Sequence, residues 1–593
     1  MFTDLTTMDT EVFPNYFLVA FKNLANGKVL TCQARGDTPL TDRQCDRLEH
    51  LLANRDTFGF NSRNYDIPII ASALAGKPPS EIYKLSEFII KGGRQWPGWK
   101  VMKKFGLAPP TGLHFDIQEP APAVMVSLKL YGGRMHSTRL QDLPIAPGTI
   151  LTKAQMIEIK DYCINDLDTT IDLYRKIEDR IKLRIEMGEK YEQALLSKSD
   201  AQIAETVLRA ANRTALSEVQ PAASFKYKVP RFIKFRTPQL REALATIRHN
   251  RFRLNAGGAV KLPPEISGLK LQVGMASYQI GIGGLHSKEK SQAVVPTGRE
   301  LLVDRDVVSY YPYIILNCGL YPPQFGPGFL GSYREIVETR LQAKREGNKV
   351  VADSLKIVIN GSFGKLGSKY SALYAPDLML AVTMTGQLSL LMLIERLELE
   401  DFRVVSANTD GFVTLVPKDR YARYDAICQD WELDTAFELE ETRYRALYAR
   451  DVNNYLALTK SGFKGKGIFA DPGLSKNPVM SICVEAAVAY LNDGTPIVTT
   501  IQECGDIRKF LTVRTVKGGA VWRGQYLGRV VRWVWGAGGE AITYQSNGNK
   551  VATSDGAVPV MDFDEIEFDE LDIDYRRYLE ATEEILTSVG ATI

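Results

Sequence analysis

The sequence predicts a multidomain protein of mixed α/β and α+β class. At 593 residues the chain is long enough for several domains, each with a hydrophobic core of its own. The first 180 residues alternate strand-like and helix-like patterns, which is typical of an α/β domain. Beyond residue 300 an apolar strand, two helical patterns, a long apolar helix and a hairpin follow one another, which favours α+β domains.

Individual segments support this class in chain order. Residues 16–23, YFLVAFKN, are strand-like, and residues 42–54, DRQCDRLEHLLAN, have a helical pattern. The pattern is helical and charged over residues 181–211. Residues 301–312, LLVDRDVVSYYP, predict an apolar strand, and residues 333–364 predict a pair of helices.

The composition is that of an ordinary soluble globular protein, with 45% hydrophobic and 24% charged residues. A formal net charge of +3 does not by itself indicate a nucleic-acid-binding protein, so any basic surface must be local. Seven scattered cysteines without a Cys-x-x-Cys pair predict neither a disulfide framework nor a zinc site, and they fit a reducing compartment. The N-terminus has acids where a signal peptide needs a basic and then an apolar run, so we expect a cytoplasmic protein.

Two segments allow more than one interpretation. Residues 225–254 hold nine Lys or Arg and one acid, Glu242, with aromatic residues interleaved. This segment is either a solvated helix face with a loop or a stripe that follows a phosphate backbone. Residues 378–394 carry no charge, but they fall short of the ~20 apolar residues of a membrane helix and include polar residues, which favours a buried core helix.

The segment VVSANTDGFVTL, residues 404–415, predicts a β-hairpin whose tip carries the lone acid Asp410. Asp306 is a second acid in a strand-like run that precedes a turn signal. Two such acids side by side would repel each other unless cations lay between them. Two Mg²⁺ ions about 3.5–4 Å apart, held by carboxylates, are the known arrangement for in-line phosphoryl transfer.

The helical pair between these acids supplies groups that suit a nucleoside triphosphate. Arg340 and Lys344 lie one helical turn apart. Lys356, Asn360 and Gly364 share one helix face, where a Gly would allow close approach of a substrate. Each of these residues, taken singly, is better explained by an ordinary helical hairpin with a solvated basic face.

The N-terminal third contains a second acidic set. Asp9 and Glu11 precede a strand, Asp66 lies between strand-like runs, and Tyr162 and Asp166 share a helix face. Four acids converging from two strands and a helix would bind two metal ions for hydrolysis, with the Tyr orienting the attacking water. In a chain with 70 acidic residues, an Asp-x-Glu pair also recurs by chance.

Taken together and in order, the motifs resemble those of a family B DNA polymerase of the compact bacteriophage type. DVVSYYP, KIVINGSFG and ANTDG are similar to that family's polymerase motifs A, B and C. DTE, NSRNYD and YCIND are similar to its three exonuclease motifs, SLKLY to the element that holds single-stranded DNA, and GIGGLHS to the Gly-Gly element between the two halves. In the same order, these are residues 306–312, 356–364, 407–411, 9–11, 61–66, 162–166, 127–131 and 281–287.

The resemblance implies an RNase H-like exonuclease domain followed by a right-hand polymerase with palm, short fingers and thumb. The expected boundaries are 1–185 for the exonuclease domain, 186–270 for a connecting helical and basic region, 271–330 and 367–450 for the two parts of the palm, 331–366 for the fingers, and 451–593 for the thumb and C-terminal region.

The resemblance also implies site residues. The catalytic and metal-binding residues would be Asp306 and Asp410 for extension, and Asp9, Glu11, Asp66, Asp166 and Tyr162 for the exonuclease. The nucleotide-binding residues would be Tyr311, the steric gate against the ribose 2′-hydroxyl, with Arg340, Lys344, Lys356, Asn360 and Phe363. The DNA-binding residues would be Asn61, Ser127, Leu128, Gly283, Gly284, Tyr455, Lys464 and Lys466.

Several positions depart from the family's pattern. Motif C has Asn408 in place of its first Asp and Gly411 in place of a Ser. Motif B has Gly361 and Phe363 in place of Ser and Tyr. The Lys of the family's Lys-x-Tyr element is Asn453, so Lys464 or Lys466 would substitute for it.

The implied activity is template-directed extension of a primer 3′-OH, with 3′→5′ proofreading, in phage-type DNA replication. The implied cofactor is Mg²⁺, two ions per site, with Mn²⁺ as the alternative. The implied partners are primer-template DNA, single-stranded DNA and dNTPs. The protein is expected to be a monomer that does not bind a membrane, and its replisome partners stay unidentified. A phage-encoded protein would act in the host cytoplasm.

Three other functions are compatible with parts of the sequence. A protein-primed polymerase of the same family carries a long insertion between motifs A and B, for which the interval from Asp306 to Asn360 leaves little room. A non-catalytic DNA-binding replication factor would be expected to lose acids from one of the two sites, whereas all six acids are present. A lone nuclease would leave the last two-thirds of the chain unexplained.

Overall fold

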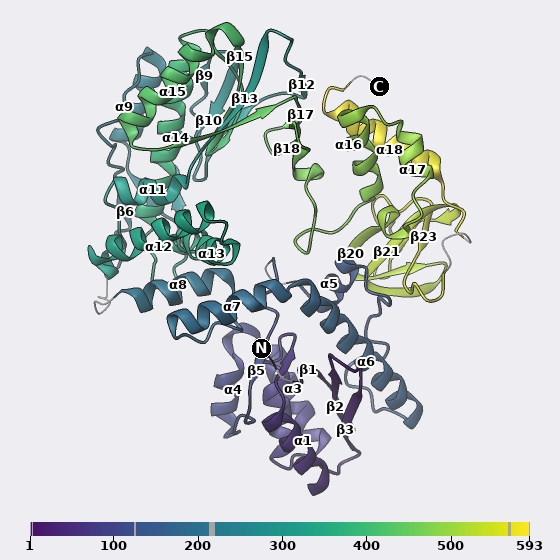
Figure 1. The fold of residues 1–593 in the computed structure, drawn as a ribbon. Helices are drawn as coiled ribbons and strands as arrows, with labels where there is room; N and C mark the ends of the chain where they lie inside the picture. The colour runs from purple at the N-terminus through teal and green to yellow at the C-terminus, as the bar shows by residue number, and fades with distance from the viewer. Residues whose placement is uncertain (1, 3, 124–125, 213–219, 567–570, 592–593) are drawn as a thin grey trace. The chain divides into compact units, whose positions relative to one another are not determined.

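The computed structural model describes residues 2, 4–123, 126–212, 220–566 and 571–591 (Figure 1). The chain divides into two compact units. The first comprises residues 1–199, 472–482 and 503–578, and the second comprises residues 200–471, 483–502 and 579–593. Residues 451–593, which we expected to form one region, are therefore shared between the units. Helices α16 (Ser481–Asp493) and α18 (Tyr575–Ser588) each contribute residues to both units.

A five-stranded sheet organises the N-terminal part of the first unit, in the order β3-β2-β1-β4-β5. The first three strands are antiparallel, whereas β4 runs parallel to both β1 and β5. The strands are β1 Thr6–Phe13, β2 Tyr16–Asn23, β3 Val29–Arg35, β4 Thr57–Gly59 and β5 His114–Asp116. The helices are α1 Asp42–Asn54, α2 Asp66–Leu74, α3 Pro79–Gly92, α4 Gly98–Phe105, α5 Leu128–Met135, α6 Lys153–Lys176 and α7 Glu178–Tyr191, with the 3₁₀ turn η1 Gly93–Gln95.

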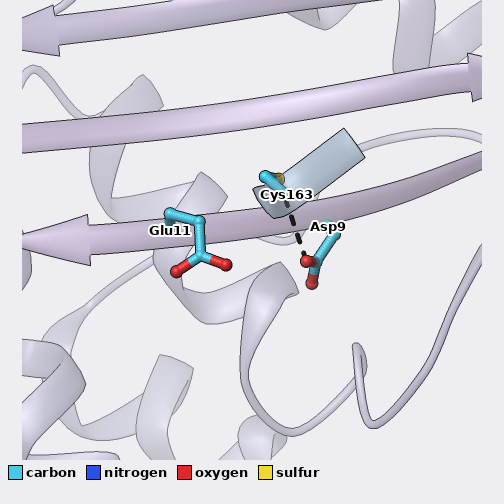
Figure 2. A group of neighbouring side chains, drawn as sticks. All are labelled: Asp9, Glu11 and Cys163. Carbon is cyan, nitrogen blue, oxygen red and sulfur yellow. Dashed lines mark hydrogen bonds between the residues drawn. The ribbon is translucent and has the colours of Figure 1, made fainter. Parts of the chain in front are cut away.

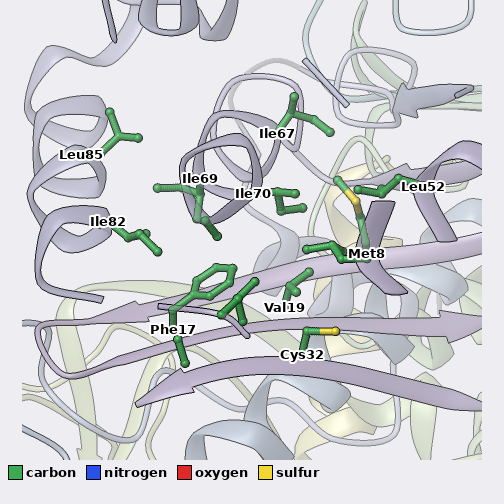
Figure 3. Packing of buried hydrophobic residues seen from close by; sticks show 14 of the residues in the cluster. Met8, Phe17, Val19, Cys32, Leu52, Ile67, Ile69, Ile70, Ile82 and Leu85 are labelled. Carbon is green, nitrogen blue, oxygen red and sulfur yellow. The ribbon is translucent and has the colours of Figure 1, made fainter. Parts of the chain in front are cut away.

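Hydrophobic clusters pack on both faces of this sheet. On one face Met8 packs with Val19, Ile70 and other residues from α1, α2 and α3 (Figure 3). On the other face Phe13 packs with residues of α6. Because side chains alternate along a strand, Asp9 and Glu11 share the face of Phe13, and β1 presents both carboxylates toward α6.

The strand-like run after Asp66 is a helix, which corrects the sequence interpretation. Residues 67–70 are apolar and lie in α2, where they are buried on all sides. Such a short apolar run has no periodicity that distinguishes a strand from a buried helix. Pro68 lies in the first turn of α2, where a missing amide hydrogen costs no helical hydrogen bond. The four N-terminal acids therefore come from one strand and two helices.

The first unit also contains a four-stranded sheet from the C-terminal part of the chain, in the order β22-β20-β21-β23. The guanidinium of Arg532 in this sheet is fully buried and donates to the carbonyl oxygens of Ser137, Thr138 and Val560. It thereby joins β21 to the segment after α5. The elements are β20 Thr512–Trp522, β21 Gln525–Glu540, β22 Thr543–Tyr544, β23 Ala557–Pro559 and the 3₁₀ turn η5 Ile507–Phe510.

The second unit is built on a seven-stranded sheet in the order β16-β13-β15-β14-β11-β10-β9. The expected hairpin is confirmed, because β14 and β15 pair as neighbours around a turn at residues 409–410. The strands are β9 Leu271–Val273, β10 Ala276–Gln279, β11 Leu285–Lys288, β13 Glu300–Val307, β14 Arg403–Thr409, β15 Gly411–Pro417 and β16 Leu439–Tyr444.

The predicted strand over residues 301–312 ends earlier than expected. β13 stops at Val307, and Tyr310 begins helix α11 (Tyr310–Asn317). Ser309 between them has a left-handed backbone, with φ of 47°. The aromatic and apolar residues after Ser309 suit either structure, and Pro312 fits the first helical turn. The turn sets Tyr311 on a helix next to the end of β13.

The apolar segment at residues 378–394 lies in helix α14 (Pro376–Glu398), as expected. Among the described residues this helix alone has the length and apolar composition of a membrane-spanning helix, and 83% of its most apolar window is buried inside the protein. It contacts α11, α13, β11 and β14, among other elements. The core-helix interpretation is therefore supported.

The predicted helical pair forms α12 (Gly328–Arg345) and α13 (Lys349–Leu366), which pack on each other and on α8 (Asp200–Ala211). A Cβ atom on Gly361 would lie 2.8 Å from the Cβ atom of Ala204 and 3.0 Å from the carbonyl oxygen of Asp200. The close packing of α8 on α13 therefore requires Gly where the family's motif has Ser.

Two smaller sheets complete the second unit, in the orders β12-β17-β18-β19 and β6-β7-β8. Their strands are β12 Gln292–Val294, β17 Ala446–Asp451, β18 Asn454–Leu458, β19 Phe463–Lys466, β6 Ser224–Phe225, β7 Phe252–Leu254 and β8 Val260–Lys261. The remaining elements are α9 Pro238–His249, α10 Pro264–Ser267, α15 Tyr421–Thr435, α17 Ile497–Gln502, η2 Pro323–Phe325, η3 Lys418–Arg420 and η4 Gly467–Phe469.

We predict that Arg532→Met destabilises the first unit by about 3 kcal/mol or more, because it removes the donor to the carbonyl oxygens of Ser137 and Val560 in a fully buried position. Arg529→Met on the same strand should cost less than ~1 kcal/mol, since the Arg529 side chain is itself exposed and the Tyr526 hydroxyl still donates to its partner Asp142. Urea unfolding followed by tryptophan fluorescence measures both. Equal losses of stability in the two variants would contradict the structural role of Arg532.

Candidate functional site

The N-terminal acids converge in the first unit. Asp9 and Glu11 project from β1, and Cys163 approaches them from α6 (Figure 2). Their ligand atoms all lie within 4.8 Å of one another. The Cys163 thiol donates to Asp9 Oδ2 at 3.8 Å. Asp66 and Asp166 lie close enough to Asp9 for their charges to act on it, so the structure brings all four predicted acids together.

Burial and mutual repulsion make this cluster unfavourable as four free carboxylates. Burial raises the pKa of Asp9 far above its usual range, and the charges of Asp66, Glu11 and Asp166 raise it further. Burial likewise raises the pKa of Glu11 and of Asp166, and it raises the pKa of Asp66 to about 7, although Thr10 donates to its carboxylate. A divalent cation between these oxygens would relieve both the repulsion and the desolvation.

Lys129 completes the cluster and was missed by the sequence analysis. Its ammonium forms an ion pair with Asp166 and lies 4.1 Å from the centre of the Tyr162 ring. The Tyr162 hydroxyl is hydrogen-bonded to Asp166 as well. The available signal was the position of Lys129 inside the quoted segment SLKLY, next to the residues expected to hold DNA.

The residues expected to bind single-stranded DNA lie in the loop between β4 and α2 and at the start of α5. Asn61 has a left-handed backbone with φ of 58°, and Asp116 holds this loop by accepting from the amides of Asn61 and Arg63 at 2.9 and 3.1 Å. Ser127 is exposed and caps α5, and the half-buried Leu128 follows it. Asp116 was also missed, since a single acid after a short apolar run carries no distinctive pattern.

The second pair of acids lies near the end of β13 and in the turn between β14 and β15 of the seven-stranded sheet. Asp306 pairs with Gly411 in the register of β13 and β15, and the Val307 amide donates to the Asp410 carbonyl at 2.8 Å. Burial raises the pKa of the Asp410 carboxyl, and the charge of Asp306 raises it further. A Cβ atom on Gly411 would lie 1.9 Å from Asp306 Oδ1, so Gly in place of the family's Ser leaves room for that carboxylate.

Asp306 shares β13 with another acid, Asp304, for which the sequence analysis proposed no role. Asp304 lies on the same face of β13, is almost fully buried, and accepts a hydrogen bond from the Tyr444 hydroxyl. Lys464 Nζ lies 3.4 Å from an oxygen of Asp304 and 3.4 Å from an oxygen of Asp306. The charges of Lys464 and Lys466 both act on Asp410. The charges of Asp304, Asp306 and Asp410 act on the hydroxyl of Tyr455.

The expected nucleotide-binding residues divide into two sets. The rings of Tyr311 and Phe363 pack at an angle, with their centres 4.6 Å apart. The charge of Asp410 acts on the Tyr311 hydroxyl. Arg340 donates to the Ser309 hydroxyl at 3.0 Å and so reaches the turn after β13. Lys344 forms an ion pair with Glu440.

Lys356 and Asn360 share an exposed face of α13 with Gly364, as expected. A Cβ atom added to Gly364 would point into open space. Within the described part of the chain, no hydrogen bond joins Lys356 or Asn360 to the acids.

Asn408, a motif departure, and Gly284, of the Gly-Gly element, have local structural reasons. The Asn408 amide donates to the Val452 carbonyl at 2.7 Å, which an Asp carboxylate in that place would repel. Gly284 lies against the hairpin tip, because a Cβ atom there would lie 2.5 Å from the Thr409 hydroxyl oxygen. Gly283 has no such neighbour. The Gly-Gly element therefore supports the turn that carries Asp410.

Both acid clusters fit divalent cations by the chemistry of their donors. Carboxylate oxygens are the ligands that Mg²⁺ and Mn²⁺ prefer. Burial and the nearby acids raise the pKa of the Cys163 thiol, which favours the neutral form that donates to Asp9 over a thiolate ligand. Asp9, Glu11, Asp66 and Asp166 would hold ions in the first unit, and Asp306 and Asp410 would hold them in the second.

Comparisons with known proteins find similar chains among solved structures but not among family models or curated proteins. The chain matches no family model and no curated protein. Among solved structures it is similar to the family B DNA polymerase from the hyperthermophilic archaeon Pyrobaculum calidifontis, with 15% sequence identity and a TM-score of 0.41. The match covers 99% of this chain and 78% of that chain. That TM-score is too low to establish a shared fold, so function is inferred from the site residues.

We predict that Mn²⁺ binding to the N-terminal cluster releases protons at pH 6 and far fewer at pH 8.5. With a pKa of about 7, the Asp66 carboxyl is mostly protonated at the lower pH, and a metal ion binds its deprotonated form. Affinity should therefore rise with pH through about 7. Calorimetric titration in buffers of different ionisation enthalpy, comparing Asp410→Asn with Asp410→Asn/Asp66→Asn, measures the release. Equal proton release by both variants would contradict this assignment.

Proposed function

We propose that the protein is a DNA-directed DNA polymerase with a 3′→5′ exonuclease, and that it extends a primer 3′-OH by two-metal nucleotidyl transfer. The proposal is supported chiefly by two separate acid clusters in two separate units. One joins Asp306 to Asp410 beside a stacked Tyr311–Phe363 pair. The other gathers four acids around a helix that carries Tyr162. Phosphoryl transfer and phosphodiester hydrolysis both use such carboxylate sets.

In the second unit the protein's contribution would be positioning and charge. Bound Mg²⁺ would activate the primer 3′-oxygen and neutralise charge on the leaving pyrophosphate. Asp306 and Asp410 would fix the reacting groups in line, because paired strands hold both carboxylates rigidly. Arg340 reaches the turn after β13 and would bind the triphosphate there. The Tyr311 ring would lie against the sugar and leave no room for a 2′-hydroxyl.

In the first unit, positioning and charge would likewise serve the hydrolysis of a phosphodiester bond. Tyr162 is hydrogen-bonded to Asp166 and lies under the Lys129 ammonium, and its hydroxyl would orient the attacking water molecule. The loop that Asp116 fixes, together with the exposed Ser127, would grip the frayed 3′ end. Cys163 would keep the Asp9 carboxylate oriented by its hydrogen bond.

The basic segment 225–254 adds support for a nucleic-acid partner. All nine of its Lys and Arg side chains are exposed, whereas Tyr227, Ile233 and Phe235 are buried. Glu395 of α14 anchors the segment by accepting from the amides of Arg236 and Thr237 at 2.9 and 2.7 Å. An anchored segment whose exposed charges are nine cations and the single acid Glu242 suits a phosphate backbone.

Two rivals remain open to experiment. A protein-primed polymerase would share both acid clusters, and the interval between β13 and α13 is filled by α11, η2 and α12, which leaves little room for an additional priming subdomain. A non-catalytic replication factor would bind DNA without extending it. Primer extension from a nucleic-acid 3′-OH, with and without dNTPs, separates the three functions.

We predict separable losses of the two activities. Asp410→Asn should lower primer extension by about three orders of magnitude and leave degradation of single-stranded DNA, because it removes one metal ligand of the second unit. Asp9→Asn with Glu11→Gln should do the reverse. A gel assay of a labelled primer measures both. A loss of extension in the folded Asp9/Glu11 variant would contradict the assignment of two sites.

Tyr311→Val should raise ribonucleotide incorporation relative to deoxyribonucleotide incorporation by about a hundredfold, since a steric penalty of ~3 kcal/mol corresponds to that factor. Tyr313→Val is the matched control, because it alters another partly buried Tyr of the same helix. Single-nucleotide incorporation kinetics with rNTPs and dNTPs measure the ratio. Unchanged discrimination in Tyr311→Val would exclude Tyr311 as the gate.

A further inference from the structure

Asp304 is a buried acid that the proposed two-metal arrangement does not use. It lies two residues before Asp306 on the same face of β13, and its side chain is 6% exposed, against 43% for Asp306. The Tyr444 hydroxyl donates to Asp304 Oδ2, and the Lys464 ammonium lies 3.4 Å from the same oxygen. Among the described residues, no group of three potential ligands that includes Asp304 gathers within 4.8 Å. Asp304 therefore does not complete a third ligand position beside Asp306 and Asp410.

Lys464 pairs with two carboxylates that differ in how deeply they are buried. Its ammonium is equally distant from Asp304 and Asp306, but Asp304 is more deeply buried and has a second donor in Tyr444. An ion pair is stronger where water is excluded. A divalent cation on Asp306 would carry twice the charge of the ammonium and would repel it. The ammonium would then keep only its contact with Asp304.

We propose that Asp304 is a positioning residue that retains Lys464 in the site when metal ions occupy Asp306 and Asp410. Held in this way, Lys464 stays beside the metal ions as a cation for a nucleotide phosphate, and it does not compete with them for Asp306. The inference rests on the proposed polymerase function and concerns the same site. It also accounts for the missing Lys at Asn453, since β19 supplies a cation from the neighbouring strand.

This role makes the effect of Asp304 depend on Lys464. Without the Asp304 charge, the ammonium has Asp306 as its remaining partner and competes with the metal ion there. Asp304→Asn should then weaken metal binding only while Lys464 is present. A direct metal ligand would instead weaken binding whether or not Lys464 is present.

A double-mutant cycle tests this dependence in the full chain. All variants carry Asp9→Asn and Glu11→Gln to silence the other metal centre, and free Mn²⁺ is measured by electron paramagnetic resonance. We expect Asp304→Asn to weaken Mn²⁺ binding about tenfold alone and less than about twofold beside Lys464→Met, as for directly coupled residues. Lys464→Met alone should tighten Mn²⁺ binding and raise the KM for dNTP more than it lowers kcat.

Equal weakening by Asp304→Asn in both backgrounds, or no weakening in either, would overturn the proposal. Asp425→Asn is the matched control: Asp425 pairs with Arg305 at 2.7 Å, from the opposite face of β13, and its loss should leave Mn²⁺ binding unchanged. If Asp304→Asn does not fold, Lys464→Met still decides, since unchanged Mn²⁺ affinity and an unchanged KM would show a merely structural ion pair. Extension by the parent chain is read separately, so a failure of the polymerase function is distinguished from a failure of the Asp304 role.

Discussion

The pairing of β13 with β15 is the constraint on which the second unit's chemistry depends. It sets Asp306 opposite Gly411 and ties the Asp410 carbonyl to the Val307 amide. A shift of one residue in this register would turn Asp306 to the other face of the sheet. The buried helix α14 packs on the same sheet, against β14, β11 and β9. The apolar core thus fixes two charged groups side by side that would otherwise separate.

Charge repulsion in a buried environment is the second common principle. In the first unit, burial and neighbouring acids raise the pKa values of Asp9, Glu11 and Asp66. In the second unit, Asp410 is affected in the same way by burial and by Asp306. Lysines offset part of the charge, Lys129 in the first unit and Lys464 with Lys466 in the second. These ammonium groups are fewer than the carboxylates around them, so both clusters are suited to divalent cations.

Three of the residues that depart from the expected motifs have contacts that explain them. Asn408 donates to a carbonyl that a carboxylate would repel, and Gly361 makes room for α8. Gly411 makes room for the Asp306 carboxylate itself. These substitutions act on packing around the site and leave its acids in place.

The sequence by itself determined the local elements and the acids with recognisable spacing. The hairpin around Asp410, the paired helices α12 and α13, the buried helix α14 and the helix face of Tyr162 and Asp166 were all predictable, because each depends on short-range periodicity or turn chemistry. The helix after Asp66 and the early end of β13 were not, because short apolar runs suit a strand or a helix until tertiary packing selects one. Only the tertiary structure decided that Lys129 meets Asp166, that Asp116 holds the Asn61 loop, and that Lys464 joins Asp304 to Asp306. These contacts join residues far apart in the chain, where spacing carries no signal and the pairing depends on how the sheets and helices pack.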